Sequence, residues 1–563
     1  MKNKGITLIA LVITIIILLI LAGIAINSIT SENGLFMRAK QAKMETEIAN
    51  IKEQIKTDIL TKQVQNEGEI TEENLKEILE SYGTLSEEEK LEEKTLTTDK
   101  GNYEIKVSDI FNETTTKENP EEPEITKVAN EPDTSGFNKN NTYYVTWDLS
   151  SSPYEIQEES NLTQTAPENW YDYTAGQNKW ANIKTTGGGN DCYWVWIPRY
   201  AYKITEGYHS NSAGTIEIKF LKGTTNTPLD GSSIEIKNQT GSGNWNVHPA
   251  FWFDKNNNEI EDQGEQLAGI WVAKYEASSS SVGTINLENG TLTGDTASLN
   301  GNGGGTDTSL QVRVKPNVTS WRRITVNGMF SVCRNLTTSG NSLQGTTGID
   351  SHMMKNTEWG AIAYLSSSIY GKTDENGSIK RIYNNPYYNN DTNCSPITGL
   401  AGGTVTQVNK GTTTNLYMYN TEKGREASTT GNVYGVYDMA GGSWEYTAAI
   451  YKSGNSNDNR SKLWDLNNLK YVDQYIENTG EQSTYYGNIN KYGDAVYETS
   501  SLGNSNTSSW NSNGSYFPNF SMPVFIRGGR SSNGNSAGIF AFDYNTNETD
   551  TYNSFRPVVI CSQ

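Results

Sequence analysis

The sequence predicts an α+β protein that begins with one long helix and continues mainly as strands and irregular loops. Three observations lead to this prediction. Residues 6–26 form a nearly unbroken apolar run, which as a helix is long enough to span the hydrocarbon core of a bilayer. Beyond residue 136, short aromatic and β-branched runs alternate with clusters of Gly, Asn and Ser, a pattern typical of strands and turns. Within residues 357–368, apolar residues recur at helical spacing.

The composition limits the classes of function. The formal net charge is −20, from 45 Lys and Arg residues against 65 Asp and Glu residues. A nucleic-acid-binding surface needs clustered Lys and Arg to contact phosphates, so we expect no nucleic acid as a partner. Three histidines and four widely spaced cysteines fit no zinc or redox motif. One or two disulfides stay open as an alternative, with no pairing indicated.

The apolar run predicts a single membrane-spanning helix that extends to about residue 65. Lys2 and Lys4 precede the run and should keep the N-terminus in the cytoplasm, which places the rest of the chain outside the cell. The alternative is an ordinary signal peptide or signal anchor. Against cleavage, no small-residue cleavage site follows the run. The helical pattern also continues as an amphipathic stripe of Ile48, Ile51, Ile55 and Ile59.

The letters KGITLI at residues 4–9 resemble the prepilin cleavage and methylation motif of type IV pilins and pseudopilins. The resemblance implies that a prepilin peptidase cuts between Gly5 and Ile6. Residues 1–5 would then be a leader, Ile6 the methylated mature N-terminus, and residues 6–65 a pilin-like transmembrane and amphipathic helix. The family usually has Glu five residues into the mature chain, where this sequence has Ala10. That departure disfavours efficient packing with other pilins in a fibre.

Residues 66–112 predict a small acidic α+β segment. Residues 72–82 have helical spacing, and residues 95–98 and 102–107 flank a turn that contains Gly101, as in a hairpin. Residues 113–135 are rich in Thr, Lys, Glu and Pro without apolar periodicity, which indicates an extended linker.

Residues 136–563 predict one α+β domain with long irregular loops. No period of 20–50 residues repeats, which argues against propellers and solenoids. The helix at residues 357–368 presents Trp359, Ile362, Ala363 and Leu365 on one face. The expected strands are residues 143–149, 193–204, 215–220, 269–275 and 525–528.

Four segments in this domain resemble formylglycine-generating-enzyme-like (sulfatase-modifying factor) domains, in the order of that family. The resemblance implies a C-type-lectin-like fold in the expanded version that this family uses. As scaffold, the motifs would bury Trp359 and Trp444, use Arg527 and Arg556 in charge-assisted hydrogen bonds, and need Gly528 and Gly529 for tight backbone geometry. The segments are VWIPRY at 195–200, KNTEW at 355–359, GVYDMAGGSWE at 435–445, and RGG at 527–529 followed by SFRP at 554–557.

The same resemblance argues against an enzyme. The family's oxidases bind copper through a cysteine pair between the RGG and GFR elements, and no cysteine lies between Arg527 and Arg556. Three scattered histidines do not supply an iron site. We therefore expect no catalytic residues and no cofactor, with structural calcium as the one metal to consider. The family often binds calcium near its G-N-x-W-E segment, where this sequence keeps Glu445 and has Gly442 in place of Asn.

Residues 530–553 are the best candidate for a binding surface. Small apolar residues form a framework, and the rest are Ser, Asn, Asp, Thr, Tyr and Arg, the mixture found in adaptable recognition surfaces. This arrangement resembles the C-terminal variable region of diversity-generating-retroelement target proteins, in which adenine mutagenesis scatters Asn codons among such residues. The alternative is an ordinary polar loop. The candidate ligand-binding residues are Arg530, Ser531, Ser532, Asn533, Asn535, Ser536, Asp543, Tyr544, Asn545, Asn547, Tyr552 and Asn553.

Together these features predict a single-pass cell-membrane protein that displays an extracellular lectin-fold domain. Its expected partners are the membrane, a prepilin peptidase, an extracellular protein or glycan ligand, and other pilins. The alternative function is a structural minor pilin or pseudopilin of a type IV pilus or secretion system.

Overall fold

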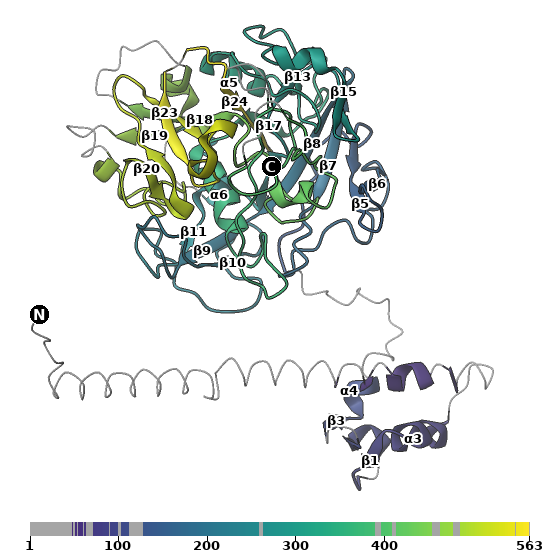
Figure 1. The fold of residues 1–563 in the computed structure, drawn as a ribbon. Helices are drawn as coiled ribbons and strands as arrows, with labels where there is room; N and C mark the ends of the chain where they lie inside the picture. The colour runs from purple at the N-terminus through teal and green to yellow at the C-terminus, as the bar shows by residue number, and fades with distance from the viewer. Residues whose placement is uncertain are drawn as a thin grey trace, which may run out of the picture. The chain divides into compact units, whose positions relative to one another are not determined.

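The structure is a computed structural model in which the chain forms two compact units, Met1–Ile125 and Thr126–Gln563. In the first unit it describes residues 48, 51–52, 54–59, 61–62, 71–88, 90–99 and 103–111. In the second it describes residues 128–561, with gaps at 258–262, 389–395, 408–411, 453–461, 477–484 and 547. The chain is α+β, and strands predominate over helices in the described part (Figure 1).

The smaller unit has helices and strands within residues 66–112, where the sequence predicts a small acidic α+β segment. Helix α3 (Glu72–Glu80) begins at Thr71, whose side chain accepts a hydrogen bond from the Asn74 backbone N–H, a normal N-cap. Strand β2 (Thr95–Thr98) pairs with both β1 (Gly83–Leu85) and β3 (Glu104–Lys106), so the predicted hairpin is present. The remaining short elements are η1 (Leu91–Glu93) and α4 (Ser108–Phe111).

The amphipathic stripe predicted at residues 48–59 is confirmed where the structure describes it. Residues 51–52, 54–59 and 61–62 are helical. Ile55 is fully buried in the core of the smaller unit, and Ile48, Ile51 and Ile59 pack against that core. The apolar run at 6–26, the leader, and the processing residues Gly5 and Ile6 lie outside the described residues. Within the described part, no helix is long and apolar enough to cross a membrane.

One large sheet of the second unit brings together strands from opposite ends of its sequence. The last strand, β25, lies between β17 and β12 and pairs antiparallel with both. Because β25 is paired on both sides, it fixes the C-terminal end of the segment that precedes it. In spatial order the strands are β17 (Ile349–Met353), β25 (Pro557–Cys561), β12 (Gly269–Ala273), β8 (Asn190–Pro198), β7 (Asn182–Gly187) and β4 (Thr142–Tyr144).

A second large sheet carries much of the C-terminal segment (Figure 1). Its strand β23 lies inside the sheet, between β22 and β21, so its backbone is paired on both sides. The order is β19 (Asp473–Ile476), β18 (Trp444–Lys452), β22 (Val524–Arg527), β23 (Phe542–Asn545), β21 (Asn513–Tyr516) and β20 (Asn504–Ser509), with β24 (Asn553–Phe555) pairing with β18.

Smaller sheets and short turns complete the strand and loop structure. The smaller sheets are β10 (Ile216–Phe220), β9 (Tyr200–Ile204) and β11 (Asn246–Val247); β5 (Thr146–Asp148) with β6 (Glu155–Glu158); β13 (Ser278–Ser279) with β16 (Val312–Arg313); and β14 (Ile285–Glu288) with β15 (Thr291–Gly294). The 3₁₀ turns are η2 (Pro249–Phe251), η3 (Gln263–Glu265), η4 (Thr296–Asn300), η5 (Gly424–Ala427), η6 (Lys462–Trp464), η7 (Leu466–Tyr471), η8 (Trp510–Ser512) and η9 (Ser531–Ser536).

Helix α6 (Asn356–Ser366) confirms the helix predicted from residues 357–368. Glu358 accepts a hydrogen bond from the Lys355 backbone N–H at 2.8 Å, which satisfies a free donor at the helix start. Apart from Thr357, its residues are buried, so the helix lies inside the unit rather than on its surface. One continuous core contains Trp359 from α6, Val559 from the first sheet and Ile526 from the second. The other long helix of this unit is α5 (Val326–Arg334).

The predicted linker ends earlier than residue 135. Asn130 is buried, and its amide nitrogen donates to the carbonyls of Gly223 and Ala268 at 3.0 and 2.9 Å. The indole of Trp271 donates to the carbonyl of Asp133 at 2.6 Å. Residues 128–135 therefore pack on the larger unit, although their polar composition gave no apolar pattern to indicate it.

The described cysteines do not form disulfides. Cys192, Cys333 and Cys561 are buried with free thiols, and Cys394 lies outside the described residues. Burial raises the pKa of the Cys192 thiol to about 12, so it remains protonated at neutral pH. These three cysteines act as small apolar core residues.

Candidate functional site

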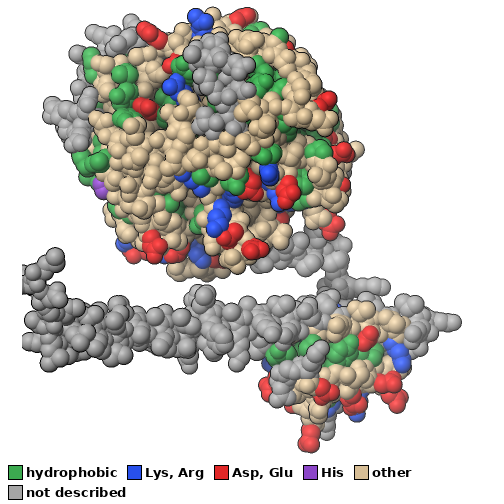
Figure 2. Space-filling view, in the orientation of Figure 1, with side chains coloured by type: hydrophobic (Ala, Val, Ile, Leu, Met, Phe, Trp, Pro, Cys, Tyr) green, Lys and Arg blue, Asp and Glu red, His purple; other side chains and the backbone are tan. Residues whose placement is uncertain are grey.

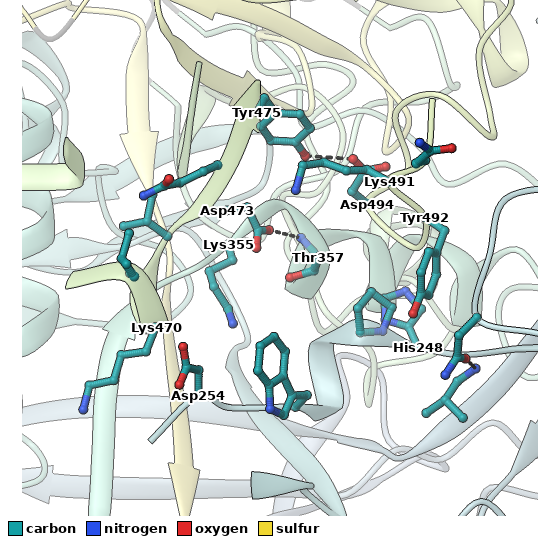
Figure 3. Close-up of a pocket in the computed structure, with 18 of the residues that line it drawn as sticks. His248, Asp254, Lys355, Thr357, Lys470, Asp473, Tyr475, Lys491, Tyr492 and Asp494 are labelled. Atoms are coloured by element: carbon teal, nitrogen blue, oxygen red, sulfur yellow. Dashed lines mark hydrogen bonds between the residues drawn. The ribbon is translucent and has the colours of Figure 1, made fainter. Parts of the chain in front are cut away.

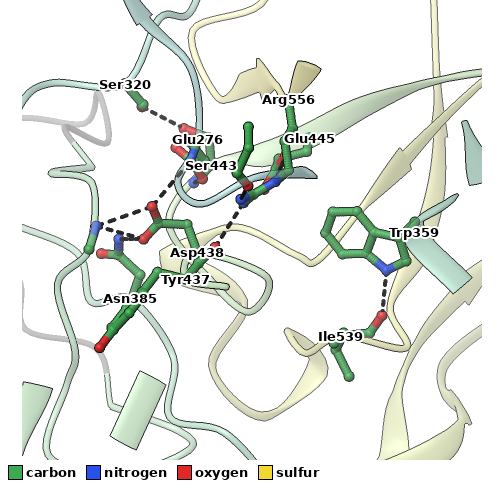
Figure 4. A network of polar contacts seen from close by, with 12 residues as sticks. Glu276, Ser320, Trp359, Asn385, Tyr437, Asp438, Ser443, Glu445, Ile539 and Arg556 are labelled. Atoms are coloured by element: carbon green, nitrogen blue, oxygen red, sulfur yellow. Dashed lines mark hydrogen bonds and ion pairs between the residues drawn. The ribbon is translucent and has the colours of Figure 1, made fainter. Parts of the chain in front are cut away.

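The candidate recognition segment, residues 530–553, has a buried frame at 537–542. Each residue from Ala537 to Phe542 is buried. The indole of Trp359 donates to the Ile539 carbonyl at 2.7 Å, as Figure 4 shows. The Ser509 hydroxyl donates to the Phe540 carbonyl at 2.8 Å. The frame is therefore held by α6 and by the end of β20, and Trp359 has the scaffold role expected of its motif.

The two motif arginines hold the ends of this region. Arg556 is fully buried and forms a bidentate ion pair with Glu445, at 3.0 Å to Oε2 and 2.6 Å to Oε1. It also donates to the carbonyls of Ala273 and Tyr437, the second of which is visible in Figure 4. Arg527 is also fully buried and donates to the Ala495 carbonyl at 3.0 Å. Both arginines therefore make the charge-assisted hydrogen bonds that the motifs predict.

The carboxylate of Glu445, considered above as a calcium ligand, is already engaged by Arg556. Both of its carboxylate oxygens accept hydrogen bonds from Arg556, so its charge is already neutralised inside the core. Two further buried carboxylates lie close by. Glu276 accepts from the Ser443 backbone N–H, and Asp438 accepts from the Gly399 backbone N–H. Among the described residues, no group of three or more His, Cys, Asp and Glu side chains is arranged to hold a metal ion.

The backbone of η9 is held by side chains that come from outside the recognition segment. Arg381 donates to the backbone carbonyls of Asn535 and Ala537 at 2.8 and 2.7 Å. Asn384 donates to the Gly534 carbonyl at 2.8 Å, and Asn513 donates to the Ala537 carbonyl at 3.0 Å. Burial lowers the pKa of the Arg381 guanidinium only to about 10, so it stays charged. Side chains from outside the segment therefore hold much of the η9 backbone. Two of its own side chains contribute as well: Asn535 Oδ1 also accepts from Arg381, at 2.7 Å, and Asn533 caps the start of η9.

The side chains of η9 differ in exposure. Ser532 and Asn535 are exposed, while Asn533 and Ser536 are half-buried. Asn533 accepts a hydrogen bond from the Arg530 backbone N–H at 2.8 Å. Ser531 is 1% exposed, and its backbone N–H donates to the Gly442 carbonyl, so its assignment as a contact residue is wrong. This buried start fixes η9 to the segment before β18.

Strand β23 divides its side chains between two faces of the sheet. Asp543 lies opposite Ile526 of β22, and Tyr544 lies opposite Phe525. Because successive strand residues point to opposite faces, Asp543 and Asn545 share one face and Tyr544 lies on the other. The ring of Tyr544 is 6.1 Å from that of Tyr516. The structure therefore does not bring all the predicted contact residues onto one surface.

Arg530, Asp543, Asn545 and Tyr552 form a half-buried polar cluster. The guanidinium carbon of Arg530 lies 4.1 Å from the centre of the Tyr552 ring, in stacking range. The Asn545 amide donates to Asp550 at 3.3 Å. Burial raises the pKa of Asp543 to about 6, and the charge of Arg530 opposes that rise. These side chains offer an aromatic ring, a cation and carboxylates within one small area.

Asn553 does not belong to this cluster. It is 1% exposed and begins β24, where it pairs with Trp444 of β18. Sheet pairing, which the sequence did not indicate at this position, turns a predicted contact residue into framework. Asn547 lies outside the described residues. Eight of the twelve candidate side chains are accessible in η9 or the polar cluster. The other four are Ser531, Asn553, Tyr544 and Asn547.

The sequence gave no sign of the residues that hold η9. Arg381 and Asn384 are separated from Gly534 by about 150 residues, and no motif links them to it.

The three histidines are also dispersed. His352 bonds to Glu358 at 2.8 Å and to Asp350 at 3.3 Å, while His248 is buried beside Tyr200 and His209 stacks on Tyr497.

Uncharged groups predominate on the face of the larger unit that Figure 2 shows. Uncharged polar side chains and backbone cover most of that face, and Lys, Arg, Asp and Glu lie mainly toward its lower part in this view. A surface of this kind favours hydrogen-bonding recognition over recognition by charge.

The chain matches no protein-family model, and no curated protein is similar to it.

Proposed function

We propose that this chain is a membrane-anchored binding protein that displays residues 530–553 to an external ligand. One observation carries the proposal: the η9 backbone is held by Arg381, Asn384 and Asn513, which lie outside the segment. A loop whose shape is fixed from outside can change its exposed side chains without losing its conformation. That property suits a recognition loop on a rigid scaffold.

The proposal includes a C-type-lectin-like fold of the formylglycine-generating-enzyme-like kind for the larger unit. The scaffold roles of the motif residues support it. Arg556 and Arg527 make the expected buried contacts, and Trp359 holds the frame. Gly528 and Gly529 have φ of +84° and +76°, a region that favours glycine. In this account the protein is a binder, and its motif residues serve the fold rather than catalysis.

The anchor is proposed from the sequence. Cleavage between Gly5 and Ile6, followed by methylation of Ile6, would leave a single-pass helix with the larger unit outside the cell. N-terminal sequencing and intact mass of the membrane-extracted protein test this directly. A mature chain that begins at methylated Ile6 supports the anchor. An intact Met1, or a chain that begins beyond residue 26, would contradict it.

The binding proposal is tested with the full-length protein on arrays of extracellular glycans and proteins. We expect at least one specific ligand. Replacing Arg530, Asp543 and Tyr552 together by Ala should abolish its binding and leave the thermal midpoint nearly unchanged, because all three are accessible. Tyr486→Ala is a matched control, since Tyr486 is 42% exposed and lies outside the segment. Binding that survives the triple variant would refute the assignment. Copurification with a fibre and no ligand would instead favour a structural pilin.

Diversification of the segment has a separate test in the neighbouring DNA. We expect a reverse transcriptase gene and a near-copy of the codons for residues 525–560. The copy should carry adenines at the codons for 530–533, 535–536, 543–547 and 549–553. Absence of both elements would make the segment an ordinary recognition loop.

A further inference from the structure

A second concave site lies away from the recognition segment. It is a cavity of about 390 Å³ that no residue from 530 to 553 lines, within the range of small-molecule sites, about 300–1,000 Å³. Its walls are η2, the first turn of α6, the end of η7 with β19, and residues 490–494 (Figure 3). These walls come from four separate stretches of sequence, so the cavity is a product of the fold.

Three lysines line this cavity, although the chain as a whole is acidic. Lys355 is 7% exposed, and its Nζ is 3.9 Å from Glu358. The Nζ of Lys491 is 5.1 Å from the centre of the Tyr475 ring, and that of Lys470 is 5.6 Å from the centre of the Phe253 ring. In the described part of the chain, neither Lys491 nor Lys470 forms an ion pair. The lining holds three lysines and three aspartates, and Lys491 and Lys470 offer ammonium groups to an anionic part of a ligand.

Carboxylates and a hydroxyl line the same cavity. Asp473 is engaged by the Thr357 backbone N–H at 2.7 Å, and Asp494 accepts from the Tyr475 hydroxyl at 2.8 Å. Asp254 is a third carboxylate, 5% exposed. Among the described residues, the buried Oγ1 of Thr357 has no hydrogen-bond partner. A simple inorganic anion would be repelled by these carboxylates. A ligand with both an anionic group and hydroxyl donors would satisfy the two sets of groups.

The remaining lining is aromatic and amide-bearing. Trp252, Tyr475 and Tyr492 supply flat, largely apolar surfaces that can pack on the C–H faces of a ring. The side-chain amides can both donate to and accept from hydroxyl groups; they belong to Asn238, Gln266, Gln474 and Asn490.

We propose that this cavity binds a sugar acid, with its carboxylate at the lysines and its hydroxyl groups at the aspartates and amides. The proposal is independent of the recognition segment, because the two sites share no residue. It adds a small-molecule specificity to a protein whose other candidate surface is accessible and adaptable.

Calorimetric titration of the full-length protein with galacturonate, glucuronate, glucose, sulfate and glutamate tests the proposal. We expect at least one uronate to bind, and glucose and sulfate to bind at least tenfold more weakly. Lys491→Gln should weaken uronate binding by about tenfold or more, because it removes a charged hydrogen bond. Lys491→Arg should retain most of the affinity. Lys423→Gln is the matched control, since the Nζ of Lys423 also lies over a tyrosine ring, 4.9 Å from the centre of Tyr417, outside the cavity.

Four outcomes would overturn the proposal. These are no uronate binding at millimolar concentration, equal binding of glucose or sulfate, tighter binding of glutamate than of either uronate, and unchanged uronate affinity in Lys491→Gln. The triple variant of Arg530, Asp543 and Tyr552 should bind uronate like the parent protein. A negative result for ligand binding at the recognition segment therefore does not affect the test of the cavity. A negative result at the cavity likewise does not affect the test of the segment.

Discussion

Within residues 527–557, a buried frame and an accessible surface follow one another along the chain, and they are held in different ways. The frame comprises residues 527–529, 537–542 and 555–557, which are buried. The accessible surface comprises η9 and the polar cluster of Arg530, Asp543, Asn545 and Tyr552. Frame residues such as Arg556 use their side chains to build the core. The backbone of η9, by contrast, is fixed by Arg381 and other side chains from elsewhere. The contrast indicates that exposed side chains of η9 can be replaced at a lower cost in stability than those of the frame, because outside residues hold its backbone.

Two arginines at opposite ends of this region give the largest expected difference. Arg556→Met leaves Glu445 buried without a partner, which should cost about 3–5 kcal/mol of unfolding free energy. Arg530→Met removes a half-buried guanidinium that stacks on Tyr552, and should cost less than about 1 kcal/mol. Chemical denaturation of both variants measures the difference. Equal losses would mean that Arg530 belongs to the frame.

Two glycines with the same backbone angle isolate the packing of the frame. Gly529 and Gly377 both have φ of +76°. A Cβ at Gly529 would lie 2.5 Å from the Cα of Ala537, while one at Gly377 would meet nothing within 4 Å. Both Ala variants pay the same left-handed cost, so Gly529→Ala should be less stable than Gly377→Ala by about 2 kcal/mol. Similar thermal midpoints for the two variants would show that the backbone around Ala537 shifts at little cost to admit a Cβ at Gly529.

Arg381→Ala tests whether η9 is held from outside. The change removes charged hydrogen bonds to the Asn535 and Ala537 carbonyls, and should cost about 1.5–2 kcal/mol. Ser532→Ala keeps every Arg381 contact and removes an exposed hydroxyl, so it should cost less than about 0.5 kcal/mol. Hydrogen exchange should show faster opening of residues 533–537 in Arg381→Ala only. Equal exchange in the two variants would contradict the proposed support of η9.

A separate expected effect is a pH dependence at Asp543. Burial raises its folded-state pKa from 3.8 to about 6, against the charge of Arg530. The folded state therefore binds the Asp543 proton more tightly than the unfolded state does. The resulting stabilisation of the folded state is fully present below pH 3.8. It falls as the pH rises to about 6. Subtracting the stability of Asp543→Asn from that of the parent protein at each pH isolates the effect. If the stability difference between the parent protein and Asp543→Asn does not change between pH 4 and 6, the Asp543 carboxylate is exposed to solvent.

The motifs predicted the frame well because each marks a local requirement. Residues 356–366 are helical as their apolar spacing indicates, and Gly529 needs its positive φ because Ala537 approaches closely. The strands expected at 215–220 and 525–528 appear as β10, which starts one residue later, and β22, which is displaced by one residue. Such features depend on neighbouring residues, so the sequence carries them.

The accessible surface was predicted less well because its geometry depends on distant residues. Ser531 and Asn553 have the polar character of contact residues, but the Gly442 carbonyl and strand β18 bury them. Glu445 was matched to calcium, although Arg556, 111 residues further along, takes its carboxylate. Arg381 supports η9 without any sequence signal. Composition singled out the segment, and only tertiary contacts separate the residues that support it from those on its surface.

Two matched libraries test the central claim most directly. One randomises Ser532, Asn533, Asn535 and Ser536 of η9, and the other randomises Ala537, Ile539, Phe540 and Ala541 of the frame. The measurement is the fraction of displayed full-length variants that resist proteolysis. We expect most members of the η9 library to resist and few members of the frame library. Equal fractions in the two libraries would contradict the division into a fixed frame and a variable surface.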